Sequence, residues 1–319
     1  MIKIGILRGG PSSEYQISLK TGQSVLDNFP EEFELGDILV DKSGDWHLEG
    51  LPIIPQKAVQ KFDIFFNCLH GAYGEDGKIQ QFFDSLNTPY TGSGALGSAL
   101  AMNKFLAKRT FAMNKIKVPE HESLKASDDL DNDLKRIFRS RTLPIIIKPM
   151  NNGSSLGVSL ARDFLELQEG VAKAFEYADE IIVEEYIRGR EATCGVLENF
   201  RGEDLYSFFP VEIVKAQNSG IFDYDTKYEG KSQEIIPGRF SQAEKKEIQR
   251  LSKLAHKVLG LRHYSRSDFI VSSNGIYILE TNTLPELTEN SLYLKSLEAV
   301  GLNLKEFNKH LINLVLSGK

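Results

Sequence analysis

Short apolar runs alternate with helix-like segments over roughly the first 95 residues, and this alternation restricts the chain to few folds. The runs are strand-sized, and the segments between them have the spacing of amphipathic helices. The expected strands are 2–7, 33–40 and 62–69, and the expected helices are 18–29 and 78–86. Strands that are joined through helices pair in parallel. We therefore predict that residues 1–96 form an N-terminal α/β domain with a parallel sheet.

The pattern changes after this region, and a length of 319 residues leaves room for two further parts. In residues 97–187 we expect helices at 98–114 and 129–139, a break at Val118-Pro119, and strands at 145–148, 158–160 and 181–186. In residues 188–319 we expect longer strands at 192–197, 205–214, 267–271 and 276–281, which suit an antiparallel sheet. The predicted class is α/β, becoming α+β in the C-terminal part.

One helix of the C-terminal part carries both of its end signals. Ser241 and Glu244 have the spacing of a capping box, and Gly260 can end the helix, so we predict a structural helix at 241–259. Before it, residues 215–239 form a polar stretch that is too long for an ordinary connection. We interpret this stretch as a lid or binding loop.

The charge balance excludes one class of partner. Lys and Arg number 38 against 44 Asp and Glu, so the formal net charge is -6. A chain with this balance lacks the broad basic face that nonspecific nucleic-acid binding needs. Any anionic ligand must therefore be held by local cations.

Cysteines and apolar runs indicate the compartment. The only two cysteines, Cys68 and Cys194, are too few for a disulfide framework or a zinc site. No apolar run is long enough to span a bilayer, and no signal peptide precedes the first strand. We expect a cytoplasmic protein that contacts no membrane.

A glycine motif suggests a nucleotide fold that its surroundings do not support. Gly92, Gly94 and Gly97 satisfy the G-x-G-x-x-G pattern of dinucleotide-binding proteins. No substantial strand precedes them, however, and Lys115 and Lys117 stand where the ribose-binding acid belongs. A P-loop motif is also missing from the sequence. A bound nucleotide would need another architecture.

Such an architecture is suggested by a glycine- and serine-rich turn after a buried strand. Lys148 ends the strand, and the turn contains Gly153, Ser154 and Ser155. Backbone N–H groups and hydroxyls in such a turn can bind phosphate oxygens, with the lysine as a point charge. Taken alone, the same pattern is typical of an ordinary structural turn.

A predicted hairpin near the C-terminal end supplies oxygen ligands. Glu280 and Asn282 are two apart on one strand, and the hairpin turn lets Asp268 face the same side. Two carboxylates and an amide oxygen suit Mg²⁺, which leaves its other positions to water and phosphate. The alternative is a solvated polar face on an antiparallel hairpin.

Together these residues resemble the D-alanine-D-alanine ligases of the ATP-grasp superfamily. The shared motifs occur in the same order and with similar spacing along nearly the whole chain. They are Gly9-Gly10 with Glu14, Ile17 and Ser18; His70 to Gly77 with Gln80; Pro89 to Gly92; Ala101 to Lys104; Lys148-Pro149 with Gly153 to Ser155; Gly189 to Glu191; Asp225 to Tyr228; Arg266 to Phe269; and Glu280 to Pro285.

The resemblance implies an ATP-grasp fold, in which an N-terminal parallel-sheet domain precedes a central subdomain at 97–187 and a catalytic subdomain at 188–319 that together clamp ATP. It implies ATP contacts from residues spread over both subdomains: Lys104, Lys148, Ser155, Glu184, Tyr186, Ile187, Glu191 and Glu280. Glu184 would accept from the adenine amine, the backbone at Tyr186 and Ile187 would contact the ring, and Glu191 would bind the ribose. Asp268, Glu280 and Asn282 would hold two Mg²⁺ ions, or Mn²⁺ in their place.

For the amino acids, the resemblance implies that Glu14 pairs with the first ammonium and Arg266 stabilises the oxyanion. Lys227 and Ser291 would bind the second carboxylate, and Tyr228 would reach Ser154, which is linked to Glu14, when the loop closes. The complete expected substrate set is Glu14, Ile17, His70, Lys227, Arg266, Ser291 and Leu292, and the expected catalytic set is Glu14, Ser154, Tyr228 and Arg266. Tyr228 would favour a dipeptide product, because ester-forming relatives carry Phe there.

His70 and Cys68 can each be interpreted in more than one way. His70 is either a substrate-side donor or a residue that organises its glycine-rich loop. A cysteine–histidine nucleophile is a third reading, but no orienting third group can be identified. We expect Cys68 to be a buried apolar residue.

The chain departs from the family at Glu286, where relatives carry a glycine after the proline of the Asn-Thr-x-Pro segment. An inward Glu286 would disfavour the oxyanion or the second carboxylate, whereas an outward one would leave the site intact. Smaller departures are Tyr15, Gln81 and Leu294.

The resemblance implies an enzyme that joins two D-alanines with ATP for peptidoglycan precursors, working as a homodimer. The alternatives are a related carboxylate–amine ligase with another amino-acid substrate and a noncatalytic ATP-binding regulator.

Overall fold

The computed structural model describes residues 1–126, 129–151, 156–215 and 232–318. Several residues named above lie outside these ranges: Gly153, Ser154, Ser155, Asp225, Lys227 and Tyr228. Most of the polar stretch at 215–239 also lies outside them. None of the helices in the described ranges combines the length and the apolar character that a membrane crossing requires.

The first sheet is built around a parallel centre, as predicted. β1 (Ile2–Gly9) pairs in parallel with β2 (Phe33–Val40) on one side and with β5 (Ile64–Asn67) on the other. The helices α1 (Tyr15–Asp27) and α3 (Lys78–Ser85) follow strands of this sheet. The short strands β3 (Trp46–Leu48) and β4 (Leu51–Pro52) extend it antiparallel to the order β4-β3-β2-β1-β5. This edge was not predicted, because strands of two or three residues show no periodicity.

The single helix expected at 98–114 is wrong, because the chain forms α4 (Ala95–Met102) and α5 (Lys104–Met113). Asn103 separates them with an extended backbone, at φ -80° and ψ 102°. Its side-chain oxygen accepts a hydrogen bond from the Leu106 N–H at 2.9 Å, which caps the start of α5. Asparagine competes for backbone hydrogen bonds in this way and favours helix starts over helix interiors.

The second sheet is antiparallel and has the strand order β6-β9-β7-β8. Its strands are β6 (His121–Lys125), β7 (Ile145–Pro149), β8 (Ser159–Ala161) and β9 (Glu180–Glu185). The helices α6 (Leu130–Ser140) and α7 (Phe164–Phe175) pack on it through one apolar cluster. β6 was missed, since His121 to Lys125 is mostly polar and only Leu124 is buried.

The third sheet is also antiparallel, as predicted, with the order β13-β12-β10-β14-β15 and β11 beside β10. Its strands are β10 (Arg190–Phe200), β11 (Glu203–Ser207), β12 (Val211–Lys215), β13 (Ser232–Ile235), β14 (Tyr264–Ser272) and β15 (Gly275–Asn282). The strand expected at 205–214 is therefore wrong, because the chain breaks between β11 and β12 at a segment that ends in Pro210, and proline cannot donate to a strand ladder.

The helix predicted at 241–259 is α9 (Gln242–Val258), and its capping box is confirmed. The Glu244 N–H donates to Ser241 Oγ at 3.2 Å, and the Ser241 N–H donates to Glu244 Oε2 at 2.6 Å. The buried face of α9 includes Ile248, Leu251 and Ala255 and packs against the third sheet.

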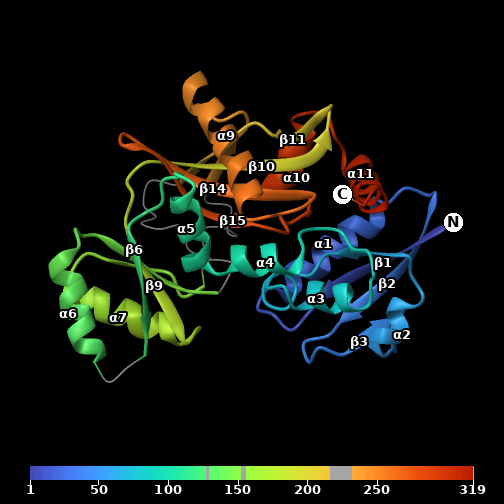
Figure 1. Cartoon of the computed structure of the whole chain (residues 1–319), viewed down its shortest axis with the longest axis horizontal. Coiled ribbons are helices and arrows are strands. Elements are labelled where there is room, and N and C mark those ends of the chain that lie inside the picture. Colours follow the sequence, from blue (N-terminus) through green and yellow to red (C-terminus); the bar gives the residue numbers. More distant parts are fainter. Residues whose placement is uncertain (127–128, 152–155, 216–231, 319) are drawn as a thin grey trace.

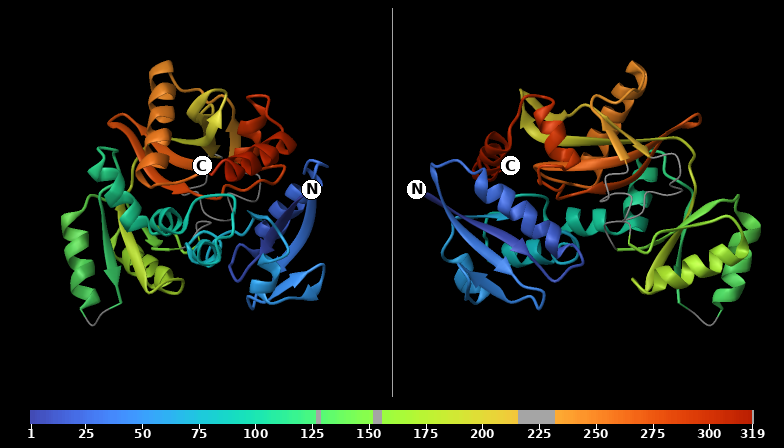
Figure 2. Two further views of the ribbon diagram at one scale, coloured as in Figure 1. Left: turned by 45° about the vertical axis from the view of Figure 1, so that its right-hand side comes forward. Right: turned by 180° about the vertical axis from the view of Figure 1, so that it is seen from behind.

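The first sheet and the last helices of the chain share one core. Figure 1 shows the first sheet at one end of the molecule, the second sheet at the other, and the third sheet above both. The views in Figure 2 show α11 (Leu304–Leu316) lying close to the first sheet. A single apolar cluster contains Ile4 of β1, Phe66 of β5 and Phe307 of α11. Two hydrogen bonds cross the same boundary, from Asn308 Nδ2 to the Asn28 carbonyl at 3.0 Å and from Ser24 Oγ to the Leu287 carbonyl at 2.8 Å.

Candidate active site

The hairpin of β14 and β15 brings the predicted metal ligands together. Asp268 stands opposite Glu280 in the register, and Arg266 stands opposite Asn282. The pair between them, Ser267 and Thr281, is buried on the other face, where the two hydroxyls are 2.8 Å apart. Since side chains alternate along a strand, one face of the hairpin presents two carboxylates, an amide and a guanidinium.

Arg266 and Asp268 hold each other on this face. Arg266 Nε donates to Asp268 Oδ1 at 3.2 Å and Nη2 donates to Oδ2 at 3.3 Å, while the Thr193 hydroxyl donates to Oδ1 at 2.5 Å. Burial opposes the charge of Arg266, but the carboxylates of Asp268, Glu280 and Glu286 together outweigh burial and raise the pKa of the guanidinium, with Asp268 contributing most. Arg266 is therefore a permanent cation in a buried position.

Asn282 and Glu280 complete the polar face. Asn282 Oδ1 accepts from the Leu284 N–H at 2.9 Å, and an amide oxygen has a second lone pair for a further partner. Glu280 Oε2 lies 3.8 Å from Lys104 Nζ, which comes from the start of α5. Within the described ranges, no three His, Cys, Asp or Glu residues cluster as a metal site. A magnesium ion here would thus depend on two carboxylates, one amide and oxygens from a ligand.

A cavity lies between the second and third sheets, beside this face. Apolar side chains line it from both sheets, with Ile146 and Val158 on one side and Ala192 and Phe269 on the other. Its lining brings together all the predicted ATP contacts except Ser155, which lies outside the described residues: Lys104, Lys148, Glu184, Tyr186, Ile187, Glu191 and Glu280. The predicted metal ligand Asp268 also lines it. An apolar slot with a few convergent charges is the ordinary form of a small-molecule site.

Glu184 is the most deeply buried acid of this cavity, at 1% exposure. Its Oε2 accepts from Lys148 Nζ at 3.1 Å, and its Oε1 lies 3.3 Å from Lys108 Nζ. Burial favours the neutral acid, but the two lysines outweigh burial and lower the pKa of Glu184 to about 2. Apart from the ion pair with Lys108, Oε1 has no hydrogen-bond partner in the described part of the chain, so the ionised carboxylate keeps accepting capacity for a bound N–H donor.

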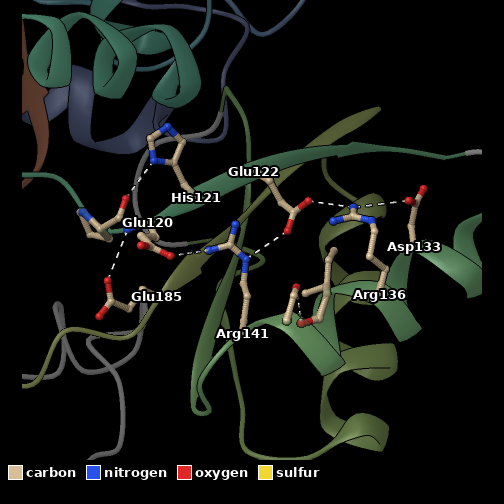
Figure 3. A network of polar contacts seen from close by, with 10 residues as sticks. Glu120, His121, Glu122, Asp133, Arg136, Arg141 and Glu185 are labelled. Carbon is tan, nitrogen blue, oxygen red and sulfur yellow. Dashed lines mark hydrogen bonds and ion pairs between the residues drawn. The ribbon is translucent and has the colours of Figure 1, made fainter.

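The strand β9 that carries Glu184 is fastened to its neighbour by a polar network (Figure 3). The Glu120 N–H donates to Glu185 Oε2 at 3.4 Å, and Arg141 pairs with Glu120 at 3.9 Å. Arg141 also donates to Glu122 at 3.0 Å, and Arg136 donates to the second oxygen of Glu122 at 2.8 Å. The network ties the end of β9 at Glu185 to β6 and α6, which supports the adjoining wall of the cavity.

A second cavity lies on the other side of Arg266, toward the first sheet. It brings together the predicted substrate residues that the structure describes: Glu14, Ile17, His70, Arg266, Ser291 and Leu292. Asn282, Glu75 and Glu286 also line it. Arg266 lines this cavity and Asp268 lines the first one, so two residues of one strand connect the two cavities.

The loop after β5 shapes one wall of the second cavity. Ser12 Oγ donates to the His70 carbonyl at 2.6 Å, and the His70 ring nitrogen Nε2 lies 2.9 Å from Thr21 Oγ1. Gly71 adopts φ +72°, and a Cβ there would stand 2.7 Å from Glu14 Oε2. The left-handed backbone favours glycine here, and a side chain would also displace the Glu14 carboxylate. His70 therefore lines the cavity and also joins the loop to α1.

Cys68 is buried at 1% exposure, as expected of an apolar residue. Burial raises the pKa of its thiol well above the ordinary value. A cysteine held as a neutral thiol is a poor nucleophile, which opposes the cysteine–histidine reading.

Glu75 lines the second cavity together with Glu14. Its Oε2 accepts from the Gly71 N–H at 2.9 Å. Burial raises the pKa of Glu75 to about 8, and the charge of Glu14 adds to the increase. In the unfolded chain the ordinary value is 4.5. Between these values the unfolded state releases a proton that the folded state keeps, so folding stability falls as the pH rises.

We therefore expect Glu75→Gln to reduce the loss of stability at alkaline pH. Between pH 5.5 and 8.5 the wild type should lose at least about 1 kcal/mol more free energy of unfolding than the variant does. Urea unfolding at the two pH values measures the difference, with the exposed Glu298→Gln as control. Equal losses in wild type and Glu75→Gln would show that Glu75 ionises as it does in water.

The positions of Glu286 and Ser291 also become clear. Glu286 is half-buried, lines the second cavity and accepts a short hydrogen bond from the Thr288 hydroxyl. This is the inward orientation, with the carboxylate close enough to help raise the pKa of Arg266. Ser291 precedes α10 (Leu292–Glu298), and its hydroxyl accepts from the Leu294 N–H at 3.2 Å.

The glycine motif at residue 92 is used for packing. The Gly92 N–H donates to the His263 ring at 2.9 Å, and a Cβ on Gly97 would stand 2.9 Å from the Gly260 carbonyl. A single parallel bridge, Phe65 to Tyr90, precedes it in place of a strand.

Lys108, a residue beside the first cavity, was not predicted from the sequence. Its signal was available, because it lies four residues after Lys104 and therefore on the same face of one helix.

Comparison with known proteins gives matches over almost the whole chain. The family model described as D-ala D-ala ligase C-terminus matches residues 111–313, and that described as D-ala D-ala ligase N-terminus matches residues 51–93. The D-alanine--D-alanine ligase of Desulfotalea psychrophila is 38% identical over 318 residues, which cover 99% of this chain and 95% of the relative. The enzyme of the same name from Syntrophobacter fumaroxidans is 36% identical over 316 residues, covering 99% and 98%.

Two solved structures are similar along the full length. The VanG D-Ala:D-Ser ligase from Enterococcus faecalis has a TM-score of 0.87 and 32% identity, and the match covers 98% of this chain and 99% of that one. The D-alanine-D-alanine ligase from Coxiella burnetii has a TM-score of 0.84 and 26% identity, covering 99% and 94%.

Proposed function

The chain belongs to the D-alanine–D-alanine ligase family, with the ATP-grasp fold, and we propose that its two connected cavities divide the reaction of that family between them. It is an ATP- and Mg²⁺-dependent ligase that joins two D-alanines and releases ADP and phosphate, a reaction of peptidoglycan synthesis. ATP would occupy the first cavity and the amino acids the second. The observation that carries this division is the β14–β15 hairpin, which presents Arg266 to one cavity and Asp268 to the other.

We infer three functional parts along the chain. Residues 1–96 would hold the first amino acid, residues 97–187 would cover the nucleotide, and residues 188–319 would supply the catalytic strand pair. The separate sheets of these parts support the division.

The lining of the first cavity fits ATP. The ionised carboxylate of Glu184 suits the exocyclic amine of adenine, while the backbone at Tyr186 and Ile187 would contact the ring and Glu191 the ribose. Lys104 and Lys148 would bind the phosphates, together with Ser155. Two Mg²⁺ ions, or Mn²⁺, held by Asp268, Glu280 and Asn282 would neutralise phosphate charge during transfer.

The second cavity would hold the reacting groups. Glu14 would pair with the ammonium of the first D-alanine, whose carboxylate attacks the γ-phosphorus and receives the phosphoryl group as ADP leaves. The amine of the second D-alanine then attacks the acyl phosphate, loses a proton, and expels phosphate as the amide forms. Arg266 would stabilise the oxyanion of this tetrahedral intermediate, because its buried charge is fixed before the reaction begins.

The remaining substrate residues would orient the two amino acids. Ile17 and His70 would border the first D-alanine, while Ser291, Leu292 and Lys227 would hold the second carboxylate. Tyr228 and Ser154, which lie outside the described residues, would link the closing loop to Glu14. We further propose a cytoplasmic homodimer with small-molecule substrates as its ligands.

The test is ADP release from purified protein with ATP and Mg²⁺. D-alanine is compared with L-alanine, D-serine, D-lactate and buffer, and the product is identified by mass. We expect ADP release that depends on D-alanine and yields the dipeptide. Release with only another acceptor would overturn the substrate, and ATP binding without any release would indicate a noncatalytic regulator.

Glu286 supplies a prediction about the second substrate. Its inward carboxylate should repel the carboxylate of the second D-alanine. We therefore expect Glu286→Gln to lower the KM for the second D-alanine by up to about 10-fold. Initial rates at saturating ATP over a range of D-alanine concentrations separate the two KM values. The exposed Glu298→Gln serves as control. An unchanged or increased KM in Glu286→Gln would show that the carboxylate does not oppose substrate binding.

A further inference from the structure

Lys108 is a fully buried lysine that the roles assigned above do not use. It has 0% exposure and is among the largest buried side chains of the protein. A lysine is almost never buried to this extent unless its charge has partners. Its surroundings therefore require an explanation.

The Lys108 amine joins three segments that meet at the first cavity. It belongs to α5, its Nζ donates to the Leu279 carbonyl of β15 at 2.8 Å, and the same atom lies 3.3 Å from Glu184 Oε1 of β9. Leu279 immediately precedes Glu280, and Lys104 stands one helical turn before Lys108. Lys108 is therefore placed to fix Glu184 relative to the hairpin.

Glu184 depends on two lysines of different accessibility. Lys148 Nζ donates to Oε2 and lines the cavity, whereas Lys108 stands at Oε1 with its side chain buried. A buried carboxylate remains ionised only if nearby cations offset the cost of burial. If the positive charge of Lys108 were removed, Glu184 would bind a proton more readily and could turn toward Lys148.

We propose that Lys108 is a positioning residue for purine recognition, which holds Glu184 as an ionised acceptor and thereby sets the preference for a 6-amino over a 6-oxo purine nucleotide. The inference rests on the proposed role of Glu184 toward adenine. An ionised carboxylate accepts from an amine and repels a carbonyl oxygen at the same place, whereas a protonated carboxyl can donate to that oxygen. Losing the charge of Lys108 should therefore weaken ATP and favour the 6-oxo analogue.

The experiment compares ATP with inosine triphosphate, which carries an oxygen in place of the amine of ATP. Equilibrium dialysis gives Kd for both nucleotides in the presence of Mg²⁺ without turnover, and kcat/KM with D-alanine gives a second reading. The variants are Lys108→Met, which keeps the length and removes the charge, and Lys108→Gln, which can still donate to the Leu279 carbonyl. The control is Lys246→Met, an exposed lysine on α9.

We expect Lys108→Met to raise the Kd of ATP about 10- to 100-fold and to reduce the preference for ATP over inosine triphosphate by at least about 10-fold. Lys108→Gln should change the preference in the same direction, and it keeps the test available if the Met variant does not fold. Lys246→Met should change neither value. If Lys108→Met weakens both nucleotides equally, its role is structural and the proposal is overturned.

Glu184→Gln separates this inference from the proposed function. If Lys108 acts through Glu184, the double variant Glu184→Gln/Lys108→Met should show the same nucleotide preference as Glu184→Gln alone. A Glu184→Gln variant that keeps the wild-type preference would overturn the adenine role of Glu184 itself. A loss of preference in Glu184→Gln, with none in Lys108→Met, would overturn only the role of Lys108.

Discussion

Asp268→Asn is expected to lower kcat by about 10³-fold, the largest loss of activity predicted here. The change keeps the size of the side chain and its contact with the Thr193 hydroxyl, but it removes one of the two carboxylates on the hairpin face. It also leaves the buried guanidinium of Arg266 without the group that most strongly stabilises its charge. The variant therefore weakens two contributions to phosphoryl transfer together, namely metal binding and the stabilisation of Arg266.

Steady-state rates of ADP release at several Mg²⁺ concentrations test this expectation. Asp204→Asn, at an exposed position of β11, controls for the general loss of a negative charge. Urea unfolding of both variants establishes that the protein still folds. Activity within about 10-fold of wild type at saturating Mg²⁺ would contradict the role of Asp268 as a metal ligand.

The largest loss of stability is expected from Phe307→Ala. Phe307 has 0% exposure, and its ring stands 5.4 Å from that of Tyr264 and 5.8 Å from that of Tyr293. Removing a buried aromatic ring leaves a cavity in a tightly packed core, so we expect the free energy of unfolding to fall by about 3–5 kcal/mol.

The stability prediction has a matched control in Phe209→Ala, since Phe209 is 40% exposed. Its loss should cost less than about 1 kcal/mol, as is usual for surface changes. The free energies come from urea unfolding followed by tryptophan fluorescence, which reports on Trp46 in the first sheet. A similar, small loss in both variants would mean that the core around Phe307 closes over the gap.

The long elements of the fold could be predicted from the sequence because each has a strong local signal. β1, β2 and β5 are short segments rich in apolar residues, and α9 has a capping box and a regular apolar face. The errors in the predicted elements occur where the local signal is weak or where one side chain ends an element. Asn103 divides a helical pattern by capping α5, and β6 has too few apolar residues to be recognised alone.

In the candidate site, too, some features could be predicted from the sequence and others could not. Asp268 and Glu280 could be placed on one face, since a two-residue period and a short turn determine strand register. The direction of Glu286 could not be predicted, because it depends on the Thr288 hydroxyl and on the nearby charge of Arg266. The spacing from Lys104 could have indicated the face on which Lys108 lies, but its burial could not be predicted, because it arises from elements far apart in the sequence, such as the Leu279 carbonyl.

The core shared by β1 and α11 has a consequence for synthesis on the ribosome. Ile4 is synthesised about 300 residues before Phe307, which belongs to the same cluster. At about 5–20 residues per second, roughly 15–60 s separate the two during translation. Throughout this interval the apolar face of the first sheet lacks its final cover. We therefore expect the nascent chain to bind chaperones during this interval, and we expect translation speed to change the yield of folded enzyme.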